Sequence, residues 1–296
     1  MRELVILSGK GGTGKTSITA AFAAVCKSAV LCDADVDAAD LHLLMAPEIK
    51  RTTDFAGGGL AVIDPEKCSG CGLCTELCRF GAISDDFVVD KIDCEGCGVC
   101  VDLCPENAID FPTQICGQWY ISDTRFGPMV HARLGIAEEN SGKLVSLVRQ
   151  QAKKLAEKKG IDLVLTDGPP GVGCPVIASI SGATALLIVT EPTVSGVHDM
   201  TRALDLAHFF KVPAMVMVNK HDLNPEQTDN IQKKVEEMGM TFLGTLPFDP
   251  VFVEAMVQGR TIVEFDDKSN ISRKIKELWD KIMLSSEMNQ KKVKLL

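Results

Sequence analysis

The chain has 296 residues and a formal net charge of −9; 46% of its residues are hydrophobic but only 5% are aromatic. This length allows one large domain, alone or with a small second one, around a mainly aliphatic core. An acidic chain is a poor candidate for unspecific nucleic-acid binding. No run of eighteen apolar residues predicts a transmembrane helix, and the N-terminus enters the first predicted strand without room for a signal peptide. We therefore expect a cytoplasmic protein.

The first motif is a glycine-rich loop between a predicted strand, residues 4–7, and a predicted helix, residues 17–27. Its sequence, GKGGTGKT, fits the P-loop pattern GxxxxGK[ST] in the strand–loop–helix context that this motif requires. Backbone N–H groups of such a loop surround a polyphosphate, and the helix N-terminus faces it. We expect Lys15 to reach the β- and γ-phosphates and the Thr16 hydroxyl to hold Mg²⁺. The predicted nucleotide-binding residues of this segment are Gly9, Lys10, Gly11, Gly12, Thr13, Gly14, Lys15, Thr16 and Ser17.

Lys10 is a second lysine inside the loop. The sequence KGGTGKT resembles the deviant Walker A motif, KGGxGK[ST], of the MinD/ParA/Mrp family, which includes the nitrogenase iron protein and the arsenite- and tail-anchor-targeting ATPases. The resemblance implies a nucleotide-dependent homodimer, or a pair with a related ATPase subunit, in which Lys10 reaches the nucleotide of the partner. A solvated loop lysine is the alternative interpretation.

A second apolar run, residues 29–32, predicts another buried strand, and several aspartates follow it. Acidic groups at the carboxyl end of a parallel strand lie where ligands bind in open α/β sheets. In the resembling family this segment is switch I, which implies that Asp35 orients the attacking water and that Asp33 supports the Mg²⁺ shell. Capping of the next helix is the alternative, and we expect it for Asp37 and Asp40.

Eight of the twelve cysteines form two copies of the run C-x₂-C-x₂-C-x₃-C. In a reducing compartment they need an explanation other than disulfides, and this spacing is that of bacterial two-cluster ferredoxins, in which the fourth cysteine of each run binds the other cluster. Zinc is the alternative, but zinc sites use paired cysteines rather than triplets with a remote fourth. The predicted [4Fe–4S] ligands are Cys68, Cys71, Cys74 and Cys104 for cluster I, and Cys94, Cys97, Cys100 and Cys78 for cluster II.

Three consecutive glycines, residues 57–59, predict a flexible junction before the cysteine-rich segment. That segment is too short for a large core, so the clusters would have to hold it together. We therefore predict an ATPase domain in two parts, residues 1–57 and 113–290, interrupted by a ferredoxin domain over residues 58–112. Residues 115–121 and 126–132 predict a hairpin that packs the insert onto the main sheet. A polar loop, residues 139–143, then caps an amphipathic helix that runs to about Lys159.

The apolar run 163–167 ends in Asp167, which is the shape of a Walker B strand, and Asp167 would hold Mg²⁺ through water. Residues 168–171 resemble switch II, which senses the γ-phosphate. Cys174 follows at a distance similar to that of a cluster-ligand cysteine in the nitrogenase iron protein, so a ligand or redox role is one interpretation and a small apolar residue is the other. We expect the remaining cysteines to lie in the core; they are Cys26, Cys32 and Cys116.

Two further buried strands, residues 185–189 and 214–218, flank a predicted helix over residues 197–210. The second strand leads into Asn219-Lys220-His221-Asp222, which resembles the base-recognition segment of P-loop nucleotidases. The family resemblance favours adenine, with Asn219 on the purine edge and Pro247 and Phe248 as a stacking wall. Asn-Lys-x-Asp is also the guanine motif of GTPases, so GTP stays open, although the deviant Walker A motif argues for ATP. His198 and His221 are expected to be ordinary surface histidines.

The last predicted element is an amphipathic helix over residues 271–284. A basic, partly apolar tail, residues 291–296, follows it. MinD-type proteins place a C-terminal amphipathic helix on membranes, but this tail is short and has no Phe or Trp, so we expect a frayed terminus rather than membrane binding.

Alternation of strands and helices predicts a mostly parallel, doubly wound α/β sheet of the P-loop NTPase class, with a small inserted α+β ferredoxin-like domain. Nearly the whole chain resembles a MinD/Mrp-type ATPase with a two-cluster ferredoxin insert, a build found near nitrogenase-cofactor-like and orange-protein systems. The leading hypothesis is an ATP- and Mg²⁺-dependent protein that couples dimerisation to electron transfer or metallocofactor maturation with a redox or cofactor-carrying partner. The alternatives are a carrier or assembly factor for an Fe–S or metal centre, and a MinD/ParA-like positioning or scaffold protein with redox-sensing clusters.

Overall fold

The computed structural model describes residues 1–135 and 140–289, and it divides the chain into two compact units. Unit 1 comprises residues 1–52, 119–132 and 141–296, and unit 2 comprises residues 53–118 and 133–140. Unit 2 thus begins before residue 58, continues past residue 112 and includes a separate segment beyond the predicted insert. The predicted loop residue Glu139 and the predicted tail 291–296 lie outside the described residues.

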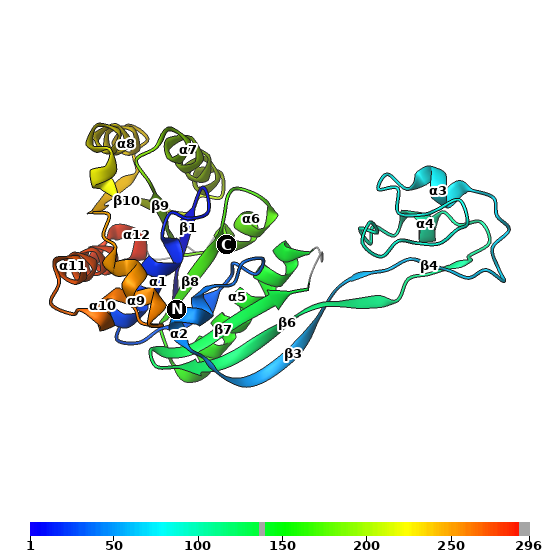
Figure 1. The fold of residues 1–296 in the computed structure, drawn as a ribbon, viewed down its shortest axis with the longest axis horizontal. Helices are drawn as coiled ribbons and strands as arrows, with labels where there is room; N and C mark the ends of the chain where they lie inside the picture. Colours follow the sequence, from blue (N-terminus) through cyan, green and yellow to red (C-terminus); the bar gives the residue numbers. More distant parts are fainter. Residues whose placement is uncertain (136–139, 290–296) are drawn as a thin grey trace, which may run out of the picture. The chain divides into compact units, whose positions relative to one another are not determined.

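Unit 1 is built on strands that alternate with helices along the chain (Figure 1). Its strands that lie wholly inside the unit are β1 (Arg2–Ser8), β2 (Val30–Asp33), β8 (Leu163–Pro170), β9 (Ala185–Thr190), β10 (Ala214–Asn219) and β11 (Thr241–Leu246). Its helices are α1 (Lys15–Val25), α2 (Leu41–Met45), α5 (Ser141–Lys159), α6 (Cys174–Ile180), α7 (Val194–Phe209), η1 (His221–Leu223), α8 (Pro225–Glu237), α9 (Val251–Val257), α10 (Ile262–Phe265), α11 (Asn270–Leu284) and α12 (Ser286–Asn289).

The strand order is β11-β10-β9-β1-β8-β2-β7-β6-β3, where β3 is Glu48–Gly59, β6 is Thr113–Thr124 and β7 is Gly127–Leu134. All neighbouring strands from β11 to β7 pair in parallel, which confirms the predicted mostly parallel α/β sheet. The predicted hairpin exists as β6 and β7, but it extends the sheet through the pairing of β7 with β2 rather than packing onto it. Parallel strands are covered on both faces, which explains why β1, β2, β8, β9 and β10 read as unbroken apolar runs.

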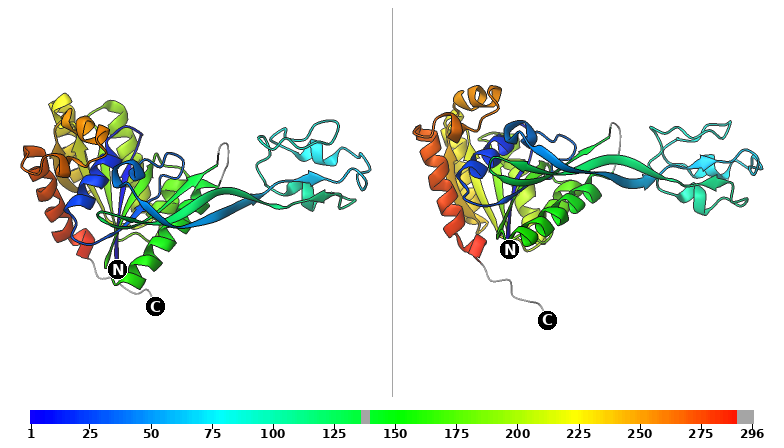
Figure 2. Two further views of the ribbon diagram at one scale, coloured as in Figure 1. Left: turned by 60° about the horizontal axis from the view of Figure 1, so that its bottom comes forward. Right: turned by 90° about the horizontal axis from the view of Figure 1, so that it is seen from below.

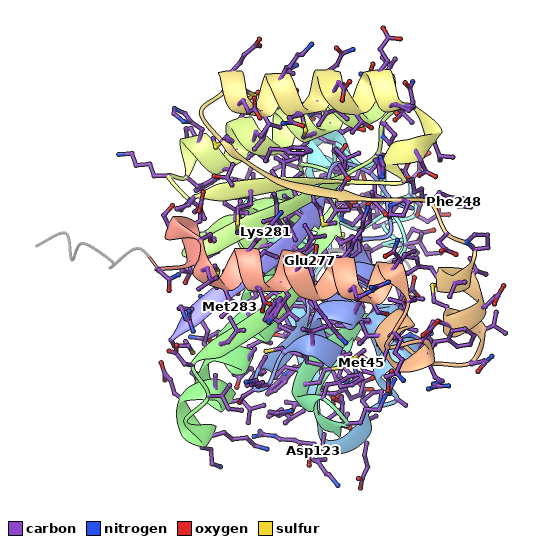
Figure 3. The ribbon with its side chains drawn as sticks, turned by 90° about the vertical axis from the view of Figure 1, so that its left-hand side faces the viewer. Met45, Asp123, Phe248, Glu277, Lys281 and Met283 are labelled. Carbon is purple, nitrogen blue, oxygen red and sulfur yellow. The ribbon has the colours of Figure 1, made fainter. Side chains whose placement is uncertain are left out.

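Two apolar clusters cover the two faces of the unit 1 sheet. Along β1, Leu4 and Ile6 belong to one cluster, with α1, α10 and α11, whereas Val5 and Leu7 belong to the other, with α6, α7 and α8. This alternation follows from the two-residue period of a strand. Figure 2 shows α11 along one face of the sheet. In Figure 3, Glu277 and Lys281 lie on the exposed side of this helix, as its amphipathic sequence predicts.

Unit 2 contains little regular structure: β4 (Val62–Ile63) pairs antiparallel with β5 (Ile109–Asp110), and the two short helices are α3 (Leu73–Leu77) and α4 (Val99–Asp102). The prediction of a flexible junction at residues 57–59 was wrong, because these glycines continue β3. A Cβ atom on Gly59 would lie 2.5 Å from the Phe111 ring, and one on Gly57 would lie 2.7 Å from Phe55. Aromatic side chains packed on the strand therefore explain the glycines.

Candidate functional site

The P-loop joins β1 to α1 at the carboxyl edge of the sheet. Gly12 and Gly14 have φ of 81° and 87°, a region that side-chain-bearing residues rarely enter. Gly14 is also the N-cap of α1, and a Cβ atom there would lie 2.6 Å from Nδ2 of Asn219. The loop therefore requires glycine at this position for two independent reasons, and the turn leaves backbone N–H groups at the helix start free to face a phosphate.

A cleft of about 560 Å³ opens above these strand ends. Its walls come from segments that follow β1, β2, β8, β10 and β11, so it lies where ligands bind in open α/β sheets. It is lined by Gly11 to Ser17 of the P-loop, and further by Ser8, Asp35, Ala38, Asp40, Leu43, Leu44, Pro170, Asn219, Lys220, Pro247, Phe248, Asp249, Phe252, Val253 and Met256. The structure thus brings most of the predicted nucleotide-binding residues into one cleft.

Lys15 and Thr16, which line this cleft, contact the buried carboxylate of Asp167 on β8. The Thr16 hydroxyl donates to Oδ2 of Asp167 at 2.7 Å, and the Lys15 ammonium lies 3.0 Å from the same oxygen. Thr19, which the sequence analysis did not single out, donates to Oδ1 of Asp167 at 2.8 Å. Burial alone would lower the pKa of Lys15, but Asp167, Asp35 and Asp33 outweigh it and the net direction is upward. The lysine therefore stays charged and is available for a polyphosphate.

Asp33 is the last residue of β2 and Asp35 follows the strand; both are buried. Burial raises the pKa of Asp35 to about 6, with Lys15 opposing this rise and Asp167 adding to it. Burial and the neighbouring Asp167 raise the pKa of Asp33 well above its usual range. Asp33 accepts the backbone N–H groups of Asp35 and Leu41, so it is Asp33 that caps the start of α2. Asp40 occupies the N-cap position of that helix without a side-chain cap bond among the described residues, so the capping role predicted for it was wrong.

This arrangement fits Mg²⁺ bound together with a nucleotide. Three carboxylates share one ammonium here, and the Thr16 hydroxyl and Asp167 oxygens are hard ligands of the kind that Mg²⁺ prefers. Within residues 1–135 and 140–289, no group of three or more His, Cys, Asp or Glu is arranged to hold a metal ion by itself. Phosphate oxygens and water would therefore have to complete the shell, as the prediction that Asp167 acts through water requires.

Lys10 behaves differently from Lys15. Its ammonium lies 3.4 Å from Oε2 of Glu191, which precedes α7, and 3.4 Å from the hydroxyl of Ser195, the second residue of α7. Neither Gly9 nor Lys10 is among the described residues that line the cleft. A Cβ atom on Gly9 would lie 2.2 Å from Cβ of Asp199, so this glycine is required for the packing of the loop against α7.

Asn219, the last residue of β10, and Lys220 directly after it donate hydrogen bonds to the P-loop. Asn219 donates its amide to the Thr13 carbonyl at 2.8 Å, and the Lys220 ammonium donates to the Gly12 carbonyl at 3.2 Å. Oδ1 of Asn219 and Oγ1 of Thr13 are buried without a hydrogen-bond partner in the described part of the chain. The Asp222 carboxylate accepts the Phe248 N–H at 2.6 Å, which lowers the pKa of Asp222. Figure 3 shows Phe248 on the loop after β11, and both Pro247 and Phe248 line the cleft.

Unit 2 places the eight run cysteines around two small cavities. One cavity is lined by Cys68, Cys71, Cys74 and Cys104, and the other by Cys78, Cys94, Cys97 and Cys100. Each cavity therefore takes three cysteines from one run and the fourth from the other run, which is the division expected from the spacing. All twelve cysteines lie in the described residues, and none of them forms a disulfide there.

The backbone around both cavities suits a sulfide-containing group. In each run, the glycines directly before and after the second cysteine have positive φ. The later of the two, Gly72 or Gly98, is the N-cap of α3 or α4, respectively. The Ala108 N–H donates to the Cys104 sulfur at 3.4 Å. Burial and the neighbouring sulfurs of Cys94, Cys97 and Cys74 raise the pKa of Cys100, so its thiolate form is disfavoured unless a cation lies beside it.

The other cysteines are placed individually. Cys32 and Cys116 are buried, as expected of core residues, whereas Cys26 is only partly buried against the core. Burial raises the pKa of Cys32 far above its usual range, which makes its thiol inert. Cys174 is exposed at the first residue of α6, directly before Pro175. His198 is exposed and lies beside Asp199 at the surface.

Sequence reasoning missed the polar contacts that span distant segments. Glu191, which pairs with both Lys10 and Lys220, carried no motif of its own. Its position directly after a buried strand was the only available signal, since acidic residues there reach the ligand edge of the sheet. Lys220 and Asp222 belong to a motif that suggested base recognition, so their contacts with the P-loop and with the loop after β11 were not predicted.

A glycine-rich loop between a strand and a helix, with a Walker B carboxylate on the neighbouring parallel strand, defines a P-loop nucleotide-binding protein. The model of the CobQ/CobB/MinD/ParA nucleotide binding domain matches residues 4–262, and the chain belongs to this family of MinD/ParA-type P-loop ATPases.

Individual relatives agree with this assignment. The chain is 33% identical to the uncharacterized protein MJ0578 of Methanocaldococcus jannaschii over 95% of this chain and 96% of that one. It is 26% identical to an iron–sulfur cluster carrier protein of Saccharolobus solfataricus, over 44% of this chain and 48% of that one. The fold is similar to the structure of the septum site-determining protein MinD complexed with Mg-ADP from Pyrococcus horikoshii, with a TM-score of 0.58 and 19% identity over 95% of both chains. No helix formed by the described residues is long and apolar enough to cross a membrane.

Proposed function

We propose that this protein is a Mg²⁺-dependent ATPase that carries two [4Fe–4S] clusters and couples nucleotide-driven dimerisation to electron transfer or metallocofactor maturation with a redox or cofactor-carrying partner protein. The observation that carries this proposal is that one chain combines a P-loop cleft with two cavities, each lined by one crossed set of four cysteines. The cleft suits phosphate chemistry, and the two cysteine-lined cavities suit one-electron storage.

In the nucleotide site, Lys15 would leave the carboxylates for the β- and γ-phosphates, and the Thr16 hydroxyl and Asp167 would hold Mg²⁺. The metal ion would neutralise charge on the phosphates as it builds up in the transition state. Asp35 would orient the attacking water, and Asp33, at the end of β2, would support the Mg²⁺ shell. The water oxygen bonds to the γ-phosphorus as the bond to the β–γ bridging oxygen breaks, giving ADP and phosphate.

Adenine is favoured over guanine as the base. In the guanine reading of Asn219-Lys220-His221-Asp222, the aspartate has to face the base, but Asp222 is not among the described residues that line the cleft and its carboxylate accepts the Phe248 N–H. Phe248, 49% exposed, presents a ring at the cleft for stacking. The unpartnered Oδ1 of Asn219 could accept a hydrogen bond from an exocyclic amino group.

In the cysteine unit, each set of four thiolates would hold one cluster, which stores and releases single electrons. The positive-φ glycines and the Ala108 N–H bond to the Cys104 sulfur support this assignment, because backbone N–H groups near sulfur stabilise its negative charge. Full four-cysteine sets favour clusters that stay in the protein.

The test is anaerobic purification, iron and sulfide analysis, and EPR of the reduced protein with and without MgATP. We expect about eight irons per chain, ATP hydrolysis, and cluster signals or potentials that shift on addition of MgATP. Iron below two per chain in anaerobically prepared, folded protein would contradict the cluster assignment. Full occupancy of both clusters with EPR signals and potentials that do not change on addition of MgATP would contradict the coupling.

The second candidate is an Fe–S carrier or assembly factor, favoured by the partial similarity to the cluster carrier protein of Saccharolobus solfataricus. Transfer of a cluster from the loaded protein to an apo-acceptor, followed by ultraviolet–visible spectroscopy and loss of iron from the donor, would favour this function over electron transfer.

A further inference from the structure

Glu191 lies between two lysines of the nucleotide site. Its carboxylate contacts Lys10, with Oε2 3.4 Å from Nζ, and makes a close contact with the Lys220 ammonium through Oε1. The Glu191 side chain is 13% exposed, against 34% for Lys10 and 26% for Lys220. The mostly buried Glu191 carboxylate thus contacts two ammonium groups that come from different segments of the chain.

The two lysines have different second contacts. Lys220 also donates to the Gly12 carbonyl, so it stays anchored to the P-loop when its contact with Glu191 changes. Among the described residues, the other contact of Lys10 is with the Ser195 hydroxyl, at 3.4 Å. Glu191 is the only one of these partners that carries a charge opposite to that of Lys10, so it dominates the position of the Lys10 ammonium.

We propose that Glu191 is a positioning residue that restrains Lys10 on its own subunit in the nucleotide-free chain, so that dimer formation requires the Lys10 ammonium to leave this carboxylate for phosphate. This inference rests on the proposed role of Lys10 in reaching the nucleotide of a second copy. A polyphosphate offers several charged oxygens to the ammonium and outcompetes one carboxylate. Because partly exposed ion pairs contribute little, the restraint is weak enough to be released by ATP.

The restraint itself is tested without nucleotide and without dimerisation. Folded protein is treated briefly with an acetylating reagent, and modification of Lys10 is measured by mass spectrometry relative to Lys281 on α11 of the same molecule. Glu191→Gln removes the charge that holds Lys10, so we expect about two- to fivefold faster acetylation of Lys10, the fold-change that corresponds to an exposed or partly exposed ion pair. Equal rates in Glu191→Gln and the unchanged protein would overturn the proposal.

Lys220→Met should change the acetylation rate of Lys10 in the opposite direction. Without Lys220, Glu191 holds Lys10 alone, so Lys10 should be acetylated more slowly than in the unchanged protein. Glu237→Gln, an exposed change of the same kind on α8 and therefore on a different helix from the reference Lys281, should leave the rate unchanged. Faster acetylation in Lys220→Met would mean that Glu191 acts only through the local loop structure and would overturn the proposal.

The consequence for assembly is measured by sedimentation velocity during titration with a non-hydrolysable ATP analogue. Glu191→Gln should lower the analogue concentration at half-maximal dimerisation by about two- to fivefold, while the affinity of the monomer for a fluorescent ADP analogue changes by less than twofold. An unchanged midpoint would overturn the regulatory role. If the unchanged protein forms no dimer at any concentration, the proposed dimer fails, and the acetylation rates still decide the restraint.

Discussion

The Thr16 hydroxyl donates a 2.7 Å hydrogen bond to the Asp167 carboxylate and so joins the first turn of α1 to β8. Thr19 and Lys15 contact the same carboxylate from the same helix. The groups proposed to bind Mg²⁺ therefore lie within hydrogen-bond distance of one another, and binding of the metal ion would have to displace these short contacts.

Thr16→Ala should separate metal-dependent from metal-independent steps. Removing one hydroxyl from the expected Mg²⁺ shell should lower ATP hydrolysis by about 100-fold, because charge on the phosphates is then poorly balanced. Binding of a fluorescent ADP analogue in EDTA should change by less than about threefold, since the P-loop N–H groups and Lys15 remain. Phosphate release and fluorescence titration measure the two quantities, and an equal loss of both would indicate a misfolded loop.

Asp35 should make the nucleotide-free protein sensitive to pH. Burial raises its pKa to about 6, so the folded state binds this proton more tightly than the unfolded state does. The resulting stabilisation is complete below about pH 4 and is lost as the pH rises through about 6. Asp35→Asn removes this titration, and at pH 7 it should raise the free energy of unfolding by about 2 kcal/mol, with little effect at pH 4. Urea unfolding at both pH values measures it.

Two controls accompany the Asp35 experiment. Asp40→Asn, an exposed change in the lining of the same cleft, should give the same stability as the unchanged protein at both pH values. A less stable Asp35→Asn protein at pH 7 would mean that the pairing of Asp35 with Lys15 contributes more than the burial of its charge costs.

Arg149 should be the residue of α5 on which the stability of unit 1 most depends. It forms an ion pair with the buried Glu3 at 2.7 Å and also donates to the carbonyls of Ala178 and Ser181 at the end of α6. Arg149→Met would leave Glu3 with Lys153 as its remaining cation and should lower the free energy of unfolding by about 3 kcal/mol. Urea unfolding of Glu3→Gln/Arg149→Met should recover part of this loss, and no recovery would contradict the pairing.

The sequence was sufficient for the elements whose own residues determine them. Buried parallel strands read as apolar runs, and the P-loop and Walker B patterns located β1, α1 and β8 without any tertiary information. The crossed division of the cysteines between the two cavities also followed from spacing, because three residues separate the fourth cysteine of each run from its triplet.

Features that depend on contacts between distant segments could not be predicted from the sequence. The glycines at 57–59 look like a flexible junction until Phe111, more than fifty residues later, is seen packed on the strand. Asp33 caps α2 although Asp40 is adjacent to that helix, because the turn after β2 brings Asp33 back onto the Leu41 N–H. The pairing of Lys10 and Lys220 with Glu191 depends in the same way on the strand order rather than on local spacing.

Cys104→Ala tests whether the fourth cysteines cross between runs. Cys104 belongs to the second run by sequence but lines the cavity of Cys68, Cys71 and Cys74. Loss of one ligand should remove or degrade that cluster alone, so iron should fall from about eight to about four per chain. If pairing followed the runs instead, the cluster of Cys94, Cys97 and Cys100 would be lost, and Cys78→Ala would give the reciprocal result.

Identity of the surviving cluster decides between these outcomes. Cys104→Ala/Cys71→Ala should lose no more iron than Cys104→Ala, because both changes act on the same cavity, whereas Cys104→Ala/Cys97→Ala should lose nearly all of it. Cys174→Ser, a change at an exposed cysteine that lines neither cavity, should keep about eight irons. A fall in iron for Cys174→Ser would instead make Cys174 a ligand, and the reverse order of the two double variants would contradict the crossed arrangement.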